Sequence, residues 1–168
     1  ETVAYALLLF VGLAGLCSEA PTGRRLFLTS LALVAAALTR PEGLLFWCLG
    51  FIPVASSARE DRWSALRAYA LPGLALVAHF GWRLAYYGAP FPNTYYVKTG
   101  GGGRMWMQGL HGLSRFARNP AHLGWLACSA AGAAVGVASR AGRRPAVVMG
   151  GAVVLQLLYI VTVGDDSL

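Results

Sequence analysis

Long apolar runs separated by short polar stretches make up most of this chain. A helix that crosses a bilayer needs about 20 consecutive, predominantly apolar residues. Segments of this kind are predicted at residues 2–16, 68–87, 122–138 and 146–163. We interpret the first as a truncated spanning helix rather than a signal peptide, because no basic region precedes its apolar core.

A fifth apolar region, residues 26–55, is interrupted by the sequence Thr39-Arg40-Pro41-Glu42-Gly43. Each half then holds about 13 residues, or about 20 Å of helix, against a hydrocarbon core of about 30 Å. Two interpretations stay open: a pair of short helices in a thin, protein-shielded place, or a re-entrant hairpin. The fold class we expect is all-α, a polytopic transmembrane bundle of about five or six membrane segments. Residues 1–168 would be a fragment of one such domain.

Residues 88–120 break the apolar pattern and are predicted to form a surface loop with its own helix. Prolines and the glycine run 100–103 exclude a continuous helix through the first part. Residues 104–118 instead place apolar side chains on one face at helical spacing, with the basic side chains elsewhere, which is typical of an interfacial amphipathic helix. The apolar positions are Met105, Met107, Leu110, Leu113 and Phe116. A polar loop with scattered apolar residues is the alternative.

Composition supports a membrane protein. Hydrophobic residues make up 57% of the chain and charged residues 12%, where a soluble domain has about 25% charged residues. The formal charge of +7 does not indicate nucleic-acid binding, because the basic residues are dispersed between apolar runs. They cluster at 23–25, 59–67 and 140–144, and loops rich in Lys and Arg face the cytoplasm. Residues 39–43, 86–120 and 164–168 then face outward.

The three cysteines predict neither a disulfide nor a metal site. They lie in or beside apolar segments and show no paired spacing with each other or with histidine. We interpret them as inert thiols that pack as small hydrophobes. No metal ligand is assigned from this sequence.

Charged residues between the two apolar halves of residues 26–55 are a first candidate site. Arg40 and Glu42 flank a proline there, and charges at such a depth are costly unless they are paired or face water. A simple outer turn, with both side chains solvated or paired with each other, is the alternative. Arg83, near the end of the predicted helix 68–87, either snorkels to the surface or binds an anion.

Polar groups in the outer loop form a second candidate site. An amide, phenols and an ammonium group suit the binding of sugar hydroxyls and a phosphate. These groups belong to Asn93, Tyr95, Tyr96 and Lys98. Asp165 follows Gly164 where the last helix emerges, and its carboxylate would bind a cation, act as a base or simply end the helix.

The order of these motifs resembles a known family. Thr39-Arg40-Pro41-Glu42-Gly43 is followed by Trp82-Arg83, by Pro92-Asn93-Thr94-Tyr95-Tyr96-Val97-Lys98, and by Val163-Gly164-Asp165. The set is similar to polytopic bacterial GT-C glycosyltransferases, in particular the group that includes the terminal arabinofuranosyltransferase of mycobacterial cell-wall synthesis. The resemblance covers about residues 39 to 166.

The resemblance implies an enzyme of the bacterial plasma membrane with its active side facing outward. Such enzymes transfer a sugar from a polyprenyl-phosphate donor to a cell-envelope glycan or another acceptor; a divalent cation is compatible with this chemistry. Arg40, Lys98 and Arg83 would bind the phosphate, while Asn93, Tyr95, Tyr96 and Glu42 would contact the sugar or acceptor. Asp165 would assist catalysis. The family's acidic first outer loop does not occur in this chain, so the fragment alone is expected to be inactive.

Two other functions fit the same sequence. A transporter or flippase component for a lipid-linked or anionic substrate also uses broken helices with polar residues. A non-catalytic membrane assembly subunit would leave the polar loop residues without a shared cavity. The expected partners are membrane lipid, a lipid-linked sugar and a glycan acceptor, without nucleic acid. The oligomeric state, the sugar and the acceptor are not determined by this sequence.

Overall fold

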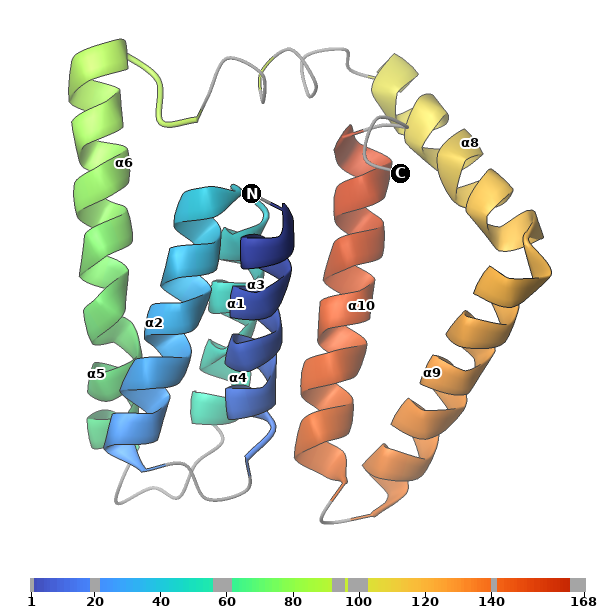
Figure 1. Cartoon of the computed structure of the whole chain (residues 1–168), viewed down its shortest axis with the longest axis horizontal. Coiled ribbons are helices and arrows are strands. Elements are labelled where there is room, and N and C mark those ends of the chain that lie inside the picture. The colour runs from blue at the N-terminus through green and yellow to red at the C-terminus, as the bar shows by residue number, and fades with distance from the viewer. Residues whose placement is uncertain are drawn as a thin grey trace.

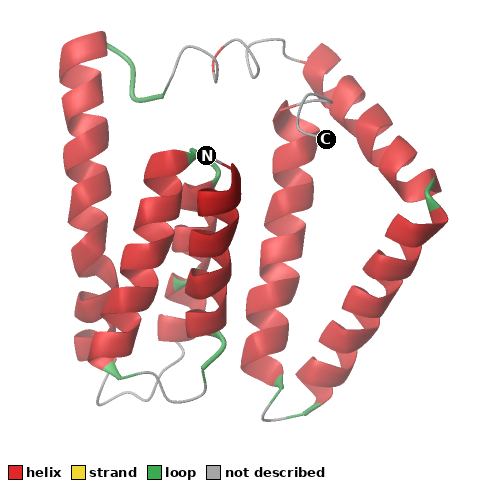
Figure 2. Ribbon diagram, in the orientation of Figure 1, coloured by secondary structure: helices red, strands yellow, loops and turns green. Residues whose placement is uncertain are grey.

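The computed structural model describes residues 2–18, 22–55, 62–91, 96, 103–139 and 142–163. Every regular element within these ranges is helical, and none is a strand (Figure 2). The all-α fold class is therefore confirmed.

The helices run up and down between two ends of the molecule (Figure 1). In chain order they are α1 (Thr2–Leu16), α2 (Gly23–Thr39), α3 (Gly43–Leu49), α4 (Phe51–Ala55), α5 (Arg62–Ala70), α6 (Leu74–Tyr87), α8 (Gly103–Arg118), α9 (Pro120–Ala138) and α10 (Arg143–Val163). A short 3-10 turn, η1 (Leu71–Gly73), joins α5 to α6. We call the end where α2, α6 and α10 finish the Arg40 end, and the opposite end the Arg144 end.

Local sequence signals set several helix ends. Thr22 caps α2, because its hydroxyl accepts a hydrogen bond from the Arg25 amide at 3.3 Å. Asn119 caps α9 in the same way through the Ala121 amide at 3.0 Å. Gly88 ends α6 with a φ of 68°, a left-handed conformation that glycine adopts without steric cost.

Close packing of α1 on α2 builds one side of the core. Added Cβ atoms at Gly12 and Gly15 would meet the side chains of Leu33 and Thr29, so the two helices approach through small residues. The buried core continues through α3, α4, α5 and α10 and includes Leu16, Leu26, Val54, Tyr69 and Val148. The interrupted region 26–55 forms α2, which has 17 residues and begins at Gly23, and the shorter α3 and α4. Whether these helices span or re-enter a membrane stays a prediction.

Two helix breaks face each other inside this core. The Tyr69 hydroxyl donates to the Trp47 carbonyl at 2.8 Å, beside the break between α3 and α4 at Gly50. Trp47 in turn packs against Gly73 in η1 and donates from its indole to Ser30 at 2.8 Å. The predicted single helix 68–87 is therefore wrong in detail: the helical segment begins at Arg62 and is divided by η1, which contains Pro72.

Within the described residues, two helices are long and apolar enough to cross a membrane. They are Pro120–Ala138, with 19 residues, and Arg143–Thr162, with 20. Thr2–Leu16 and Gly43–Ala55 are apolar but shorter. Many large apolar side chains are exposed across the bundle, and none of the described side chains in the apolar stretch of α9 is buried.

The predicted amphipathic helix 104–118 exists as α8 and crosses the end of α10 obliquely (Figure 1). It contacts α10 through glycine, because a Cβ at Gly109 would meet the Val161 backbone. Met107 and Leu110, on the predicted apolar face, are exposed at the protein surface. The predicted helix is present, and the contact of its apolar face with a membrane stays a prediction.

Candidate functional site

The described parts of the chain that adjoin the predicted polar segments lie at the Arg40 end. The turn between α2 and α3, the end of α6 and the end of α10 all lie there (Figure 1). The basic residues beside the short loops lie at the Arg144 end, where the Arg144 side chain donates from Nε to the Leu16 carbonyl at 3.0 Å. The described helix ends alternate between the two ends of the bundle as predicted along the chain, and their orientation across a membrane stays a prediction.

The turn between α2 and α3 is fixed by its own backbone. The Thr39 hydroxyl and the Arg40 amide both donate to the Ala36 carbonyl, at 2.7 and 2.9 Å, which closes α2. The Gly43 amide then donates to the Arg40 carbonyl at 2.9 Å. A Cβ at Gly43 would lie 2.5 Å from the Ala37 nitrogen, so only glycine lets α3 start this close to α2.

Arg40 and Glu42 form an ion pair at this turn, with 2.5 Å between Nε and Oε1. The Glu42 side chain is 4% exposed, whereas the Arg40 side chain is 40% exposed. The guanidinium also lies over the Tyr5 ring, 5.3 Å from its centroid, so α1 supports it by a cation–π contact. The structure thus realises the pairing that the sequence left open, and it leaves part of the guanidinium at the surface.

Arg83 and Tyr96 hold the start of the outer loop. The Arg83 Nε donates to the Pro90 carbonyl at 3.0 Å, and its guanidinium lies 5.3 Å from the centroid of the Tyr87 ring. The Tyr96 hydroxyl accepts a hydrogen bond from the Phe91 amide at 3.4 Å. Both side chains therefore position loop backbone, and their roles toward phosphate and sugar stay predictions.

The remaining predicted site residues lie outside the described residues. These are Asn93, Tyr95, Lys98 and Asp165. The chain enters their segments from α6 and leaves α10 at the Arg40 end (Figure 1). Their binding and catalytic roles stay predictions.

Tyr5 contacts Arg40 of the Arg40–Glu42 ion pair, and the sequence did not predict this contact. Tyr5 lies near the start of α1 and is 8% exposed, and the Arg40 guanidinium lies over its ring. In the sequence, the one sign of this role is a single phenol in an otherwise apolar helix, about one turn from the start of α1. That pattern is visible in the sequence but does not show which helices meet there.

Metal-binding geometry is absent from the described part of the chain, where no three His, Cys, Asp or Glu side chains group together. A cation at the aspartates beyond α10 stays a prediction. Just after α1, burial raises the pKa of the Cys17 thiol, and the nearby Arg144 guanidinium partly offsets this. A raised pKa lowers the thiolate fraction, so Cys17 is expected to react slowly, and the inert role of the three cysteines stays a prediction.

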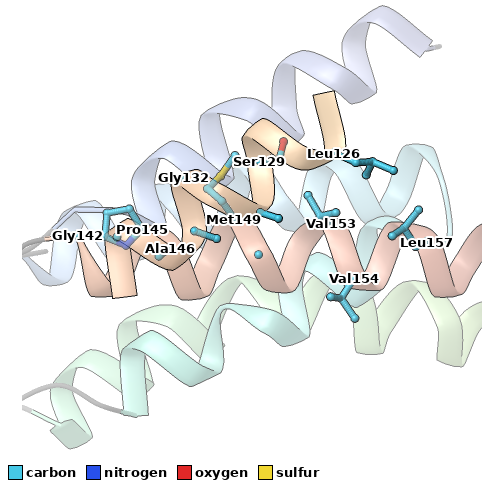
Figure 3. Close-up of a pocket in the computed structure, with 14 residues that line it drawn as sticks. Leu126, Ser129, Gly132, Gly142, Pro145, Ala146, Met149, Val153, Val154 and Leu157 are labelled. Atoms are coloured by element: carbon cyan, nitrogen blue, oxygen red, sulfur yellow. The ribbon is translucent and has the colours of Figure 1, made fainter. Parts of the chain in front are cut away.

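Two apolar grooves lie in parts of the structure that do not include Arg40 or Glu42. One, of about 700 Å³, separates α9 from α10 and is lined by Gly132, Met149, Val153 and Leu157 among others (Figure 3). The other, of about 430 Å³, follows α6 from Gly73 to Pro90 against Leu44 and Trp47. Neither groove is lined by a charged side chain, so neither is a candidate for the phosphate-binding site.

Comparison of the chain with protein-family models, with curated proteins and with solved structures finds no match.

Proposed function

We propose that this chain is part of a membrane glycosyltransferase that transfers a sugar from a polyprenyl-phosphate donor to a cell-envelope acceptor at the outer membrane surface. The observation that carries the proposal is the convergence of motifs. The Arg40–Glu42 turn, the end of α6 with Arg83 and the end of α10 are far apart in sequence and share one end of the bundle. Two motifs of the family resemblance, Arg40–Glu42 and Trp82–Arg83, lie in these described parts, and the other two motifs follow α6 and α10 in the chain.

Exposed apolar surface supports a bilayer as the surroundings of the bundle. Val77 and Val135 are 71% and 72% exposed, and they lie on different helices. Large contiguous apolar surface on a monomer is typical of a membrane or protein contact. In this proposal, α1, the α2–α3 hairpin and the α5–α6 segment are membrane segments beside the two long apolar helices.

The chemistry of transfer assigns a role to each group. A departing polyprenyl phosphate carries negative charge, which cations stabilise in the transition state. The half-exposed Arg40 guanidinium and the Lys98 ammonium would supply that charge, and Asn93, Tyr95 and Tyr96 would contact the sugar. Within the described residues, Glu42 has the one carboxylate, and Arg40 already binds it. The base that deprotonates the acceptor is therefore assigned to another carboxylate, with Asp165 as a candidate.

The residues that fill the helix breaks in the middle of the bundle disfavour a transporter. The paired breaks at Gly50 and η1 resemble the discontinuous helices of transporters. They are filled by Trp47, Tyr69 and Ser30, whose polar atoms bond one another or the backbone. No charged side chain of the described residues belongs to this set, whereas charged residues near the midplane are typical of ion and substrate pathways in membrane proteins.

The test is sugar transfer by the whole protein in membranes, with a radiolabelled polyprenyl-phosphate sugar as donor. Arg40→Gln and Lys98→Ala should each lower the transfer rate at least about tenfold, because each removes one charge-assisted hydrogen bond to phosphate. The matched control is Arg67→Gln, an exposed basic residue at the Arg144 end that should retain full activity. Unchanged transfer by both site variants would refute the proposal, and so would donor-driven flux across the membrane without transfer.

A further inference from the structure

The larger apolar groove, between α9 and α10, is not used by the proposed function. Its volume is about 700 Å³, and ligand pockets typically have about 300–1,000 Å³. Apart from the Ser129 hydroxyl, the side chains that line the groove are apolar, and Gly132 and Gly150 contribute none (Figure 3). An added Cβ at either glycine would meet nothing within 4 Å, so no described residue fills the space beside them.

The groove covers a defined length of α10. It begins at Gly142 and Pro145, beside the start of the helix, and Leu157 is the last residue of α10 that lines it. Pro145 and Leu157 lie about 18 Å apart along the helix axis, at about 1.5 Å per residue. One leaflet of a bilayer contributes about 15 Å of hydrocarbon, half of a core of about 30 Å. The groove thus matches the depth of one leaflet, the one at the Arg144 end.

Along α10, positive charge lies at only one end of this groove. The helix begins with Arg143 and Arg144 and has no acidic residue in its first turn, where the helix dipole is also positive. Arg143 is exposed, whereas the Arg144 Nε is already bound to the Leu16 carbonyl. The sequence 139–144 holds three arginines and no acidic residue, and α10 carries no charge beyond Leu157. An anion is therefore favoured beside Arg143 and not farther along the helix.

A phospholipid with an anionic headgroup complements both features. Its acyl chain matches the apolar lining and the length of the groove, and its phosphate accepts charge-assisted hydrogen bonds from a guanidinium. The groove is open at the side, because Met149 and Val154 line it and are exposed. A lipid can therefore enter from the bilayer. A lipid without net charge would fill the groove but would gain less from the arginines.

We propose that the α9–α10 groove binds one anionic phospholipid of the leaflet at the Arg144 end. The acyl chain lies in the groove, and the headgroup phosphate lies beyond its end, on Arg143. Arg144 adds positive charge from its fixed place beside α1. This inference goes beyond the proposed function, because the lipid site is at the end of the bundle opposite Arg40 and takes no part in sugar transfer. It requires only that the bundle lies in a bilayer.

The experiment titrates the whole protein, in an uncharged detergent, with dioleoyl phosphatidylglycerol or dioleoyl phosphatidylcholine. Native mass spectrometry measures the bound lipid. We expect phosphatidylglycerol to bind about five- to tenfold more tightly, because phosphatidylcholine has no net charge. Arg143→Gln should remove most of this preference and leave the affinity for phosphatidylcholine unchanged. The matched control is Arg67→Gln, an exposed arginine of α5 at the same end, which should keep the preference.

Gly132→Leu tests the groove itself. The leucine side chain would occupy the space of the acyl chain, so binding of both lipids should weaken at least about fivefold. Gly124→Leu is the matched control on the same helix. An added Cβ at Gly124 also meets nothing within 4 Å, but Gly124 does not line the groove, so this variant should bind both lipids normally. Both changes replace glycine in α9, so they gain the same helix propensity.

Four results would overturn the proposal. The first is equal affinity of the unmodified protein for the two lipids, and the second is normal phosphatidylglycerol binding by Gly132→Leu. The third is an equal loss of preference in Arg67→Gln and Arg143→Gln, which would reflect the general charge of this end. The fourth is a dimer that Gly132→Leu abolishes, because a second copy of the chain would then occupy the groove. None of these results concerns sugar transfer, which Arg40→Gln tests separately.

Discussion

Gly43 controls the geometry of the candidate site, and Gly43→Ala tests this directly. A Cβ at this position would lie 2.5 to 2.7 Å from three backbone atoms of Ala36 and Ala37. The closest of these contacts is about 0.9 Å inside the 3.4 Å at which ordinary van der Waals contact begins. Backbone atoms cannot move aside as the end of a flexible side chain does, so α3 must shift away from α2.

The expected cost follows from two opposing terms. Overpacking at a tight contact destabilises by about 1–3 kcal/mol. Alanine recovers at most about 1 kcal/mol through its higher helix propensity, and less in a first turn. A net loss of about 1–2 kcal/mol should lower the thermal midpoint by about 2–8 °C in a chain of this length. Because Glu42 precedes Gly43, the same shift should also weaken ligand binding at Arg40.

Thermal unfolding in detergent, followed by circular dichroism, measures the effect. The matched control is Gly81→Ala in α6, where an added Cβ would meet nothing within 4 Å. That variant should be as stable as the unmodified protein or more stable by up to about 1 kcal/mol. If Gly43→Ala proves as stable as Gly81→Ala, the close approach of α3 to α2 is not present, and the site geometry built on it is wrong.

Three further outcomes follow from the packing and the charges. Tyr69→Phe should lose about 1–2 kcal/mol of stability in the same unfolding assay, because it leaves a buried carbonyl at the helix break without its 2.8 Å donor; an unchanged midpoint would contradict that bond. Glu42→Gln should cost about 1 kcal/mol, since the half-exposed Arg40 recovers part of the lost attraction from water; equal stability would show that the pair contributes nothing. Burial raises the pKa of Cys17 despite the nearby Arg144, so its alkylation by iodoacetamide should be slower than that of free cysteine at pH 8 and keep rising above pH 9. The rate is measured in a variant whose other two cysteines are replaced by alanine. An alkylation rate of Cys17 equal to that of free cysteine would contradict the raised pKa.

Hydrophobic length predicted the elements whose ends carry strong local signals. The segments 122–138 and 146–163 correspond to α9 and α10, because Pro120 and the polar residues before Arg143 interrupt the apolar pattern. The turn at Arg40 was predicted from Pro41 for the same reason. In contrast, η1 was missed because Pro72 lies inside an apolar run, where hydropathy alone shows no break.

Tertiary contacts account for what the sequence could not show. The ion pair of Arg40 with Glu42 needed only local spacing, so it appeared among the alternatives. The part played by Tyr5 depends on α1 packing beside α2, which no periodicity reports. The packing of α8 on α10 through Gly109 also could not be predicted, because helical periodicity identifies an apolar face but not the small residue that lets two backbones approach closely.

The central claim is that the polar segments share one membrane surface and the basic loops share the other. Its most direct measurement is labelling of intact cells by a membrane-impermeant maleimide, in variants whose native cysteines are replaced by alanine. Tyr96→Cys, in the outer loop, should be labelled from outside, and Ser64→Cys, at the Arg144 end, only after permeabilisation. Labelling of both from the same side would contradict the topology and, with it, the proposed outward-facing transferase site.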